Sequence, residues 1–157
     1  MEKKRILCFG DSLTWGYDPD TRTRFPSPSR WPMVLQELLG ENWTVIEEGQ
    51  SGRTIATEDP AEGEKNGLKY IGPCLESHTP LDLVILMLGS NDCKRKFSYS
   101  SMDIAGEMQI LLEKILAYLH ATPEESAEFY SQLIPARLFG KSAGQFTCRA
   151  VICRVEK

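Results

Sequence analysis

The sequence predicts one α/β domain built on a parallel β-sheet, and two observations carry that prediction. Short apolar runs of strand length alternate with longer segments whose apolar residues recur at helical spacing. Each of the three apolar runs is followed by a glycine-containing turn. This alternation is typical of parallel strands joined by right-handed helical crossovers. A chain of 157 residues is long enough for one such domain with a sizeable core.

Three segments are predicted to be the strands. Residues 5–9 form a short apolar run that stops at Gly10, and residues 43–47 precede the glycine-rich residues 49–52. Residues 81–88 (LDLVILML) are the most apolar run of the chain. A run of this kind is typical of a central parallel strand that is buried on both faces.

Three segments are predicted to be helical. Residues 31–39 carry apolar residues at helical spacing, with a proline near the start and a glycine just after the end. Residues 68–75 are expected to form a helix or a pair of short turns. Residues 104–119 form a long amphipathic pattern, for which Ser101 is the expected N-cap.

Composition narrows the class of protein and its partners. The chain is 41% apolar and 25% charged with a net charge of −4, as in ordinary soluble proteins. Its Lys and Arg residues are scattered, which argues against a nucleic-acid partner. No apolar run reaches membrane-spanning length, so no membrane partner is expected. The five cysteines form no C-x-x-C pair, so we expect a reduced, cytoplasmic chain without a metal site.

Polar residues that follow the predicted strands are the candidates for chemistry, because ligands bind outside the carboxyl ends of parallel strands. Ser12 follows a strand-ending glycine, so its hydroxyl can stand clear of the sheet as a nucleophile. Gly52 permits close backbone approach and Asn91 supplies a neutral N–H donor, which together suit an oxyanion hole. Alternatively, Ser12 is only a helix N-cap. Asp11 and Asp92 are expected to support their turns by binding backbone N–H groups.

Arg53 directly follows the second of these turns. It could reach a carboxylate on a substrate, but a solvent-exposed side chain is the simpler expectation. The sequence contains no glycine pattern typical of phosphate-binding loops, which argues against a nucleotide-binding module.

Together these turns resemble the sequence blocks of the GDSL family, also called SGNH hydrolases, over residues 6–119. The first block is matched at residues 10–13 (GDSL), the second-block glycine at Gly52, and the third block, G-x-N-D, at residues 89–92. The resemblance implies a three-layer, flavodoxin-like α/β fold with a parallel sheet.

The same resemblance implies a serine hydrolase of carboxylic esters, of the esterase or lipase-like kind, that needs no cofactor. Ser12 would be the nucleophile, and the oxyanion donors would be the Ser12 and Gly52 N–H groups and the Asn91 side chain. A narrower similarity is to the arylesterase-like branch, suggested by residues 16–19 (GYDP) and 66–68 (NGL). That branch implies small acyl or aryl esters as substrates and assembly into homo-oligomers.

The family's last block, D-x-x-H, has no match in these 157 residues. The last aspartate is Asp103, and the two histidines, His78 and His120, lie upstream of the place where the block belongs. His78 precedes the most apolar strand and His120 ends the long helix, where a cation is favourable, so both are expected to be structural. The sequence therefore lacks an evident general base for Ser12.

We treat residues 1–157 as one domain with a motif-bearing part, residues 5–120, and an atypical segment, residues 121–157. The atypical segment offers only one predicted helix, at residues 123–133, and one apolar pair, at residues 151–152. The fold is thus expected to be incomplete or altered after about residue 120. One explanation is a frame change or truncation; another is a partner subunit or unrecognised residue that supplies the base. A catalytically impaired protein or a binding pseudoenzyme is therefore the alternative to an active esterase.

Overall fold

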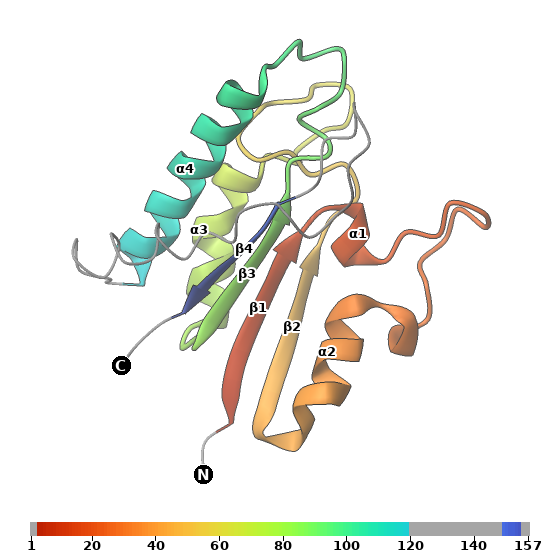
Figure 1. Cartoon of the computed structure of the whole chain (residues 1–157), viewed down its shortest axis with the longest axis vertical. Coiled ribbons are helices and arrows are strands. Elements are labelled where there is room, and N and C mark those ends of the chain that lie inside the picture. Colours follow the sequence, from red (N-terminus) through yellow and green to blue (C-terminus); the bar gives the residue numbers. More distant parts are fainter. Residues whose placement is uncertain (1–2, 120–148, 155–157) are drawn as a thin grey trace.

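The structure is a computed structural model of the chain, and it describes residues 3–119 and 149–154 (Figure 1). Its sheet has four strands in the order β2-β1-β3-β4. These strands are β1 (Lys4–Gly10), β2 (Trp43–Gly49), β3 (Leu83–Leu88) and β4 (Arg149–Arg154). The central strand β1 pairs in parallel with β2 on one side and β3 on the other, as the sequence predicts.

The sheet departs from the prediction at one edge, where β4 pairs antiparallel to β3. The apolar pair Val151 and Ile152 belongs to this strand. This strand falls in the segment after residue 120 that the sequence expects to be altered, and either strand direction satisfies the backbone hydrogen bonds of an edge. The helix predicted at residues 123–133 and the residue His120 lie outside the described residues.

Helices cover both faces of the sheet (Figure 1). The helices are α1 (Ser12–Trp15), α2 (Trp31–Leu39), α3 (Gly67–His78) and α4 (Ser101–Tyr118). Helix α2 packs on one face, and α3 and α4 pack side by side on the other. The segment predicted as a helix or two turns is therefore one helix, α3. No helix within the described ranges is long and apolar enough to cross a membrane.

The N-cap of α4 is Ser100, not the predicted Ser101. The Ser100 hydroxyl accepts a hydrogen bond from the Asp103 backbone N–H (3.2 Å), and the Asp103 carboxylate accepts one from the Ser100 N–H (2.8 Å). Only a serine three residues before the acidic side chain can form this reciprocal capping box. The spacing to Asp103 therefore decides the helix start.

Successive side chains along β1 point to opposite faces of the sheet, so this strand contributes to two apolar clusters. Leu7 and Phe9 join the larger apolar cluster with α3 and α4, whereas Cys8 joins the smaller cluster beneath α2. Burial raises the pKa of the Cys8 thiol to about 12, as expected of a small apolar core residue. At the other end of the sheet, the Asp82 carboxylate accepts a hydrogen bond from the Arg5 N–H (2.8 Å).

Candidate active site

The Ser12 turn is shaped by a buried aspartate. Asp11 is the N-cap of α1, and its carboxylate accepts a hydrogen bond from the Leu13 N–H at 3.0 Å. Ser12 is the first helical residue and is half-buried. The alternative that Ser12 itself caps the helix is therefore wrong, because Asp11 takes that position.

Helix α1 sits directly on the ends of β1 and β2, which requires glycines there. A Cβ on Gly10 would overlap the Thr14 hydroxyl and lie 2.8 Å from the Met87 carbonyl oxygen. A Cβ on Gly49 would overlap the Trp15 backbone nitrogen. These contacts bring Ser12 to the carboxyl edge of the sheet, where ligands of open α/β sheets bind.

The first turn contacts the other two predicted turns through hydrogen bonds. The second oxygen of Asp11 accepts a hydrogen bond from the Ser90 hydroxyl, and the Asp11 N–H donates to the Met87 carbonyl (3.3 Å). The Gly10 carbonyl accepts a hydrogen bond from the Gln50 N–H at 3.1 Å. The Ser12 turn thus lies between the Gly52 turn and the Asn91 turn.

Asn91 points toward the Gly52 turn. Its side-chain N–H donates to the Arg53 carbonyl at 3.0 Å, one residue from Gly52. Gly52 has a φ of +84°, a left-handed conformation that favours glycine. The structure therefore brings the backbone beside Gly52 and the Asn91 amide into direct contact.

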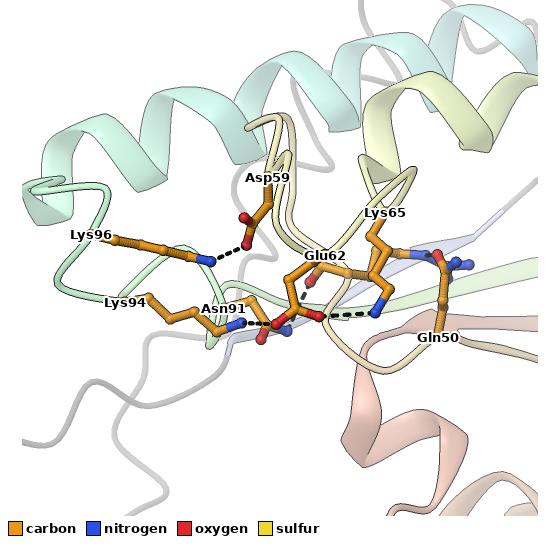
Figure 2. Close-up of polar contacts among 8 residues, drawn as sticks. Gln50, Asp59, Glu62, Lys65, Asn91, Lys94 and Lys96 are labelled. Atoms are coloured by element: carbon orange, nitrogen blue, oxygen red, sulfur yellow. Dashed lines mark hydrogen bonds and ion pairs between the residues drawn. The ribbon is translucent and has the colours of Figure 1, made fainter.

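An ion-pair network is centred on Glu62 (Figure 2). The Glu62 carboxylate lies between the ammonium groups of Lys65 (3.0 Å) and Lys94 (3.6 Å). A Cβ on Gly52 would lie 3.1 Å from both the Glu62 carboxylate and the Lys65 Nζ. Because Lys94 follows the Asn91 turn, this network links residues 62–65 to that turn.

Arg53 is buried, with 3% of its surface exposed, so the expectation of a solvated side chain is wrong. Its guanidinium lies over the rings of Phe9 (4.1 Å) and Tyr70 (5.2 Å). It donates hydrogen bonds to the carbonyls of Gly10 (2.9 Å) and Glu48, at the ends of β1 and β2. Burial lowers the pKa of Arg53, and the stacking and hydrogen bonds offset the cost of desolvation.

Asp92 is fully buried, and it contacts the backbone that follows the Gly52 turn. One carboxylate oxygen accepts a hydrogen bond from the Ile55 N–H at 2.9 Å. Burial raises the pKa of Asp92 to about 6, and the neighbouring Glu107 carboxylate adds to the rise. Glu107 accepts a hydrogen bond from the Thr57 hydroxyl at 2.7 Å. Both carboxylates therefore hold residues 55–57.

Sequence reasoning missed Glu107. The signal was present, because position 107 lies three residues after Ile104 and four before Leu111, on the apolar face of α4. An acidic residue on that face indicates a buried polar contact.

His78, expected to be structural, contacts the Glu48 carboxylate at 2.8 Å. Within the described residues, the side chains of Glu48, Cys74 and His78 form a group that could hold a metal ion.

The sequence model of the GDSL-like Lipase/Acylhydrolase family matches residues 8–146 of the chain. The chain belongs to this family. The resemblance found in the blocks around Ser12, Gly52 and Asn91 is thereby confirmed at the level of the family, while the roles of those residues stay predictions.

Solved structures of esterases share the fold of this GDSL-family chain. The aryl esterase of M. smegmatis is 48% identical with a TM-score of 0.69, and the match covers 72% of this chain and 54% of that one. Est24, a carbohydrate acetylesterase from Sinorhizobium meliloti, is 42% identical with a TM-score of 0.70, and the match covers 73% of this chain and 55% of Est24.

An acetylxylan esterase from Xylanibacter ruminicola is 30% identical over 95 residues, which make up 57% of this chain and 17% of that protein. The GDSL-family chain therefore spans about half the length of the solved structures it matches, and much less of the acetylxylan esterase.

Proposed function

We propose that this chain hydrolyses carboxylic esters through an acyl-enzyme formed on Ser12. The observation that carries the proposal is the contact among three turns that follow strands. Asp11 caps α1 and binds Ser90, and Asn91 binds the backbone beside Gly52. Ser12 follows β1 at the carboxyl edge of the sheet, and the proposal takes Gly52 and Asn91, on the two turns that contact this one, as its donors. Membership of an esterase-containing family supports the same reaction class.

In the proposed mechanism the Ser12 hydroxyl oxygen attacks the ester carbonyl carbon and the alcohol leaves with a proton. Water then attacks the acyl-enzyme and releases the acid. The Ser12 and Gly52 N–H groups and the Asn91 amide stabilise the negative oxygen that develops. The Asn91 amide has two N–H bonds. One is held by the Arg53 carbonyl, so the other is oriented in advance.

Small acyl or aryl esters are the proposed substrates, because the similar solved structures are an aryl esterase and a carbohydrate acetylesterase. Assembly into a homo-oligomer and a cytoplasmic location stay predictions from the sequence.

The second candidate is a catalytically impaired or inactive form of the same fold, such as a binding pseudoenzyme. Two observations favour it: the 157 residues contain no D-x-x-H, and His78 contacts Glu48. Without a base, a serine hydroxyl is a poor nucleophile at neutral pH. Loss of a triad member costs about four to six orders of magnitude in turnover, and the oxyanion donors alone leave about a thousandfold over water. We expect the chain as given to be a weak esterase or none.

The test uses the acetate ester of a chromogenic phenol and the 157-residue chain beside its Ser12→Ala, His78→Ala and His120→Ala variants. Slow hydrolysis that Ser12→Ala abolishes, with both histidine variants unchanged, would support the proposal of an impaired esterase. Fast hydrolysis that one histidine variant abolishes would identify the base and refute the impaired form. Activity that is indifferent to Ser12→Ala would contradict the acyl-enzyme on this serine. Ser77→Ala, an exposed change on α3, is the matched control.

The oxyanion assignment has a separate test. Asn91→Ala is expected to reduce any Ser12-dependent turnover by about two orders of magnitude, as loss of one oxyanion donor does. Circular dichroism and denaturant unfolding establish that the variant is folded. Unchanged turnover in the folded variant would remove Asn91 from the proposed oxyanion hole.

A further inference from the structure

Three side chains with different metal-binding atoms meet between α3 and β2. Cys74 and His78 lie four residues apart on α3, so their side chains lie on one face of the helix. Glu48 comes from β2, and its carboxylate lies 2.8 Å from the His78 Nε2. The ligand atoms of all three residues lie within 4.8 Å of one another.

We propose that Glu48, Cys74 and His78 form a binding site for Zn²⁺ or a similar divalent transition-metal ion. A residue pair at positions i and i+4 of a helix, with a third ligand from another element, is a known way to build a zinc site. The sequence expectation of no metal rested on the absence of C-x-x-C pairs. The Cys-x-x-x-His pair of α3 has a different spacing.

The distances suit a small ion with short bonds. Zinc bonds of about 2.0–2.3 Å place tetrahedral ligand atoms roughly 3.3–3.8 Å apart. The three atoms therefore need shifts of less than about 1 Å each, within the reach of side-chain rotation. The His78 and Glu48 side chains are 24% and 20% exposed, so solvent water can supply the fourth ligand.

The ligand types favour Zn²⁺ over Mg²⁺ or Ca²⁺. Thiolate and imidazole are ligands of the transition metals, whereas Mg²⁺ and Ca²⁺ take oxygen ligands. The Tyr70 hydroxyl donates a hydrogen bond to the other Glu48 oxygen at 3.3 Å, and thereby orients the carboxylate. Such outer contacts strengthen a metal site.

Two features of the surroundings limit the affinity. Cys74 is 1% exposed, and burial raises the pKa of its thiol to about 12, so the thiol is protonated when no ion is bound. On binding, the S–H bond breaks, a sulfur–metal bond forms, and the proton leaves to the solvent. The Arg53 cation, which interacts with Glu48 and Cys74, opposes a second positive charge. Both features oppose ion binding, so the test below looks for a dissociation constant in the micromolar range.

The test is a titration of the full 157-residue chain with Co²⁺, a coloured substitute for Zn²⁺. A bound thiolate gives a thiolate-to-cobalt charge-transfer absorption, and Zn²⁺ is expected to abolish it by displacement. Cys74→Ser should remove the absorption, and His78→Gln should weaken Co²⁺ binding at least tenfold. Cys93→Ser, at a cysteine outside the site, is the matched control and should leave the titration unchanged, as should Cys148→Ser and Cys153→Ser.

The absence of the absorption in the folded wild-type chain at 1 mM Co²⁺, roughly a thousandfold above a micromolar dissociation constant, would overturn the proposal. Its persistence in Cys74→Ser would do so too. If Cys74→Ser does not fold, Glu48→Gln and His78→Gln decide, since both residues are partly exposed. Unchanged Co²⁺ binding in either folded variant overturns the site. The titration does not depend on ester hydrolysis, and Ser12→Ala should bind Co²⁺ like the wild type.

Discussion

The turns after β1 and β3 look alike in sequence, but their glycines are needed for different reasons. Gly10 has no positive φ, and a Cβ there would overlap the Thr14 hydroxyl and crowd the Met87 carbonyl. Gly89 has a φ of +115°, and a Cβ there would meet nothing closer than 3.8 Å. The first turn is limited by space and the third by backbone conformation. A shared motif letter therefore does not imply a shared tolerance to substitution.

The aspartates of the two turns also differ, in how many hydrogen bonds their carboxylates accept. Asp11 and Asp92 are both fully buried. Both oxygens of Asp11 accept hydrogen bonds, one from the Leu13 N–H and one from the Ser90 hydroxyl. Asp92 satisfies one oxygen with the Ile55 N–H, and the other has no hydrogen-bond donor among the described residues. Its neighbour there is the Glu107 carboxylate, which raises the cost of ionising Asp92.

The largest expected effect separates the two glycines. Gly10→Ala should lower the free energy of unfolding by more than about 4 kcal/mol, because α1 must move off the end of β1. Gly89→Ala should cost about 1–3 kcal/mol, the range for a residue held in an unfavourable backbone conformation. Denaturant unfolding of the two variants measures the difference. Equal losses would show that space does not distinguish the turns.

The second effect is a pH dependence of stability that comes from Asp92. Asp92 has a pKa of about 6 when folded and an ordinary value of 3.8, so between these values the folded chain keeps a proton that the unfolded chain has lost. The contribution of Asp92 to the free energy of unfolding therefore falls by on the order of 2 kcal/mol as the pH rises from about 4 to 6.

The measurement compares denaturant unfolding of the wild type and Asp92→Asn between pH 4 and 7. Subtracting the variant removes the contributions of other carboxylates, several of which have lowered pKa values and act in the opposite direction. A difference between the two proteins that stays constant with pH would contradict the raised pKa.

The smallest expected effect is that Asp92→Asn and Asp11→Asn change the free energy of unfolding in opposite directions at pH 7. Asp92→Asn should raise the free energy of unfolding by about 1 kcal/mol, because the amide accepts from the Ile55 N–H, donates to Glu107 and carries no charge. Asp11→Asn should lower it by about 1 kcal/mol, because a carboxylate that accepts two hydrogen bonds loses one acceptor. The same unfolding assay reads both. A loss in both variants would mean that the Asp92–Glu107 contact is not repulsive.

The three parallel strands could be predicted because each is an apolar run closed by a glycine turn, and their observed ends lie within two residues of the predicted ones. The turns that carry Ser12, Gly52 and Asn91 followed from those strands. The burial of Arg53 could not be predicted, since it depends on carbonyls and rings supplied by distant elements. The direction of β4 could not be predicted either, because the sequence of an edge strand carries no local signal of which way it runs.

The contacts that close the two ends of the sheet have a consequence for how the chain folds. Arg53 binds a carbonyl 43 positions away, and Asp82 binds the Arg5 N–H 77 positions away. Contacts over such separations form only after long loops close, which makes folding slow. The Ser12 turn leaves the ribosome early, but its partners Ser90 and Arg53 follow much later. The contacts around Ser12, the proposed nucleophile, are thus incomplete until residue 90 has been synthesised, and synthesis paused before Ser90 would leave Asp11 without its second hydrogen bond.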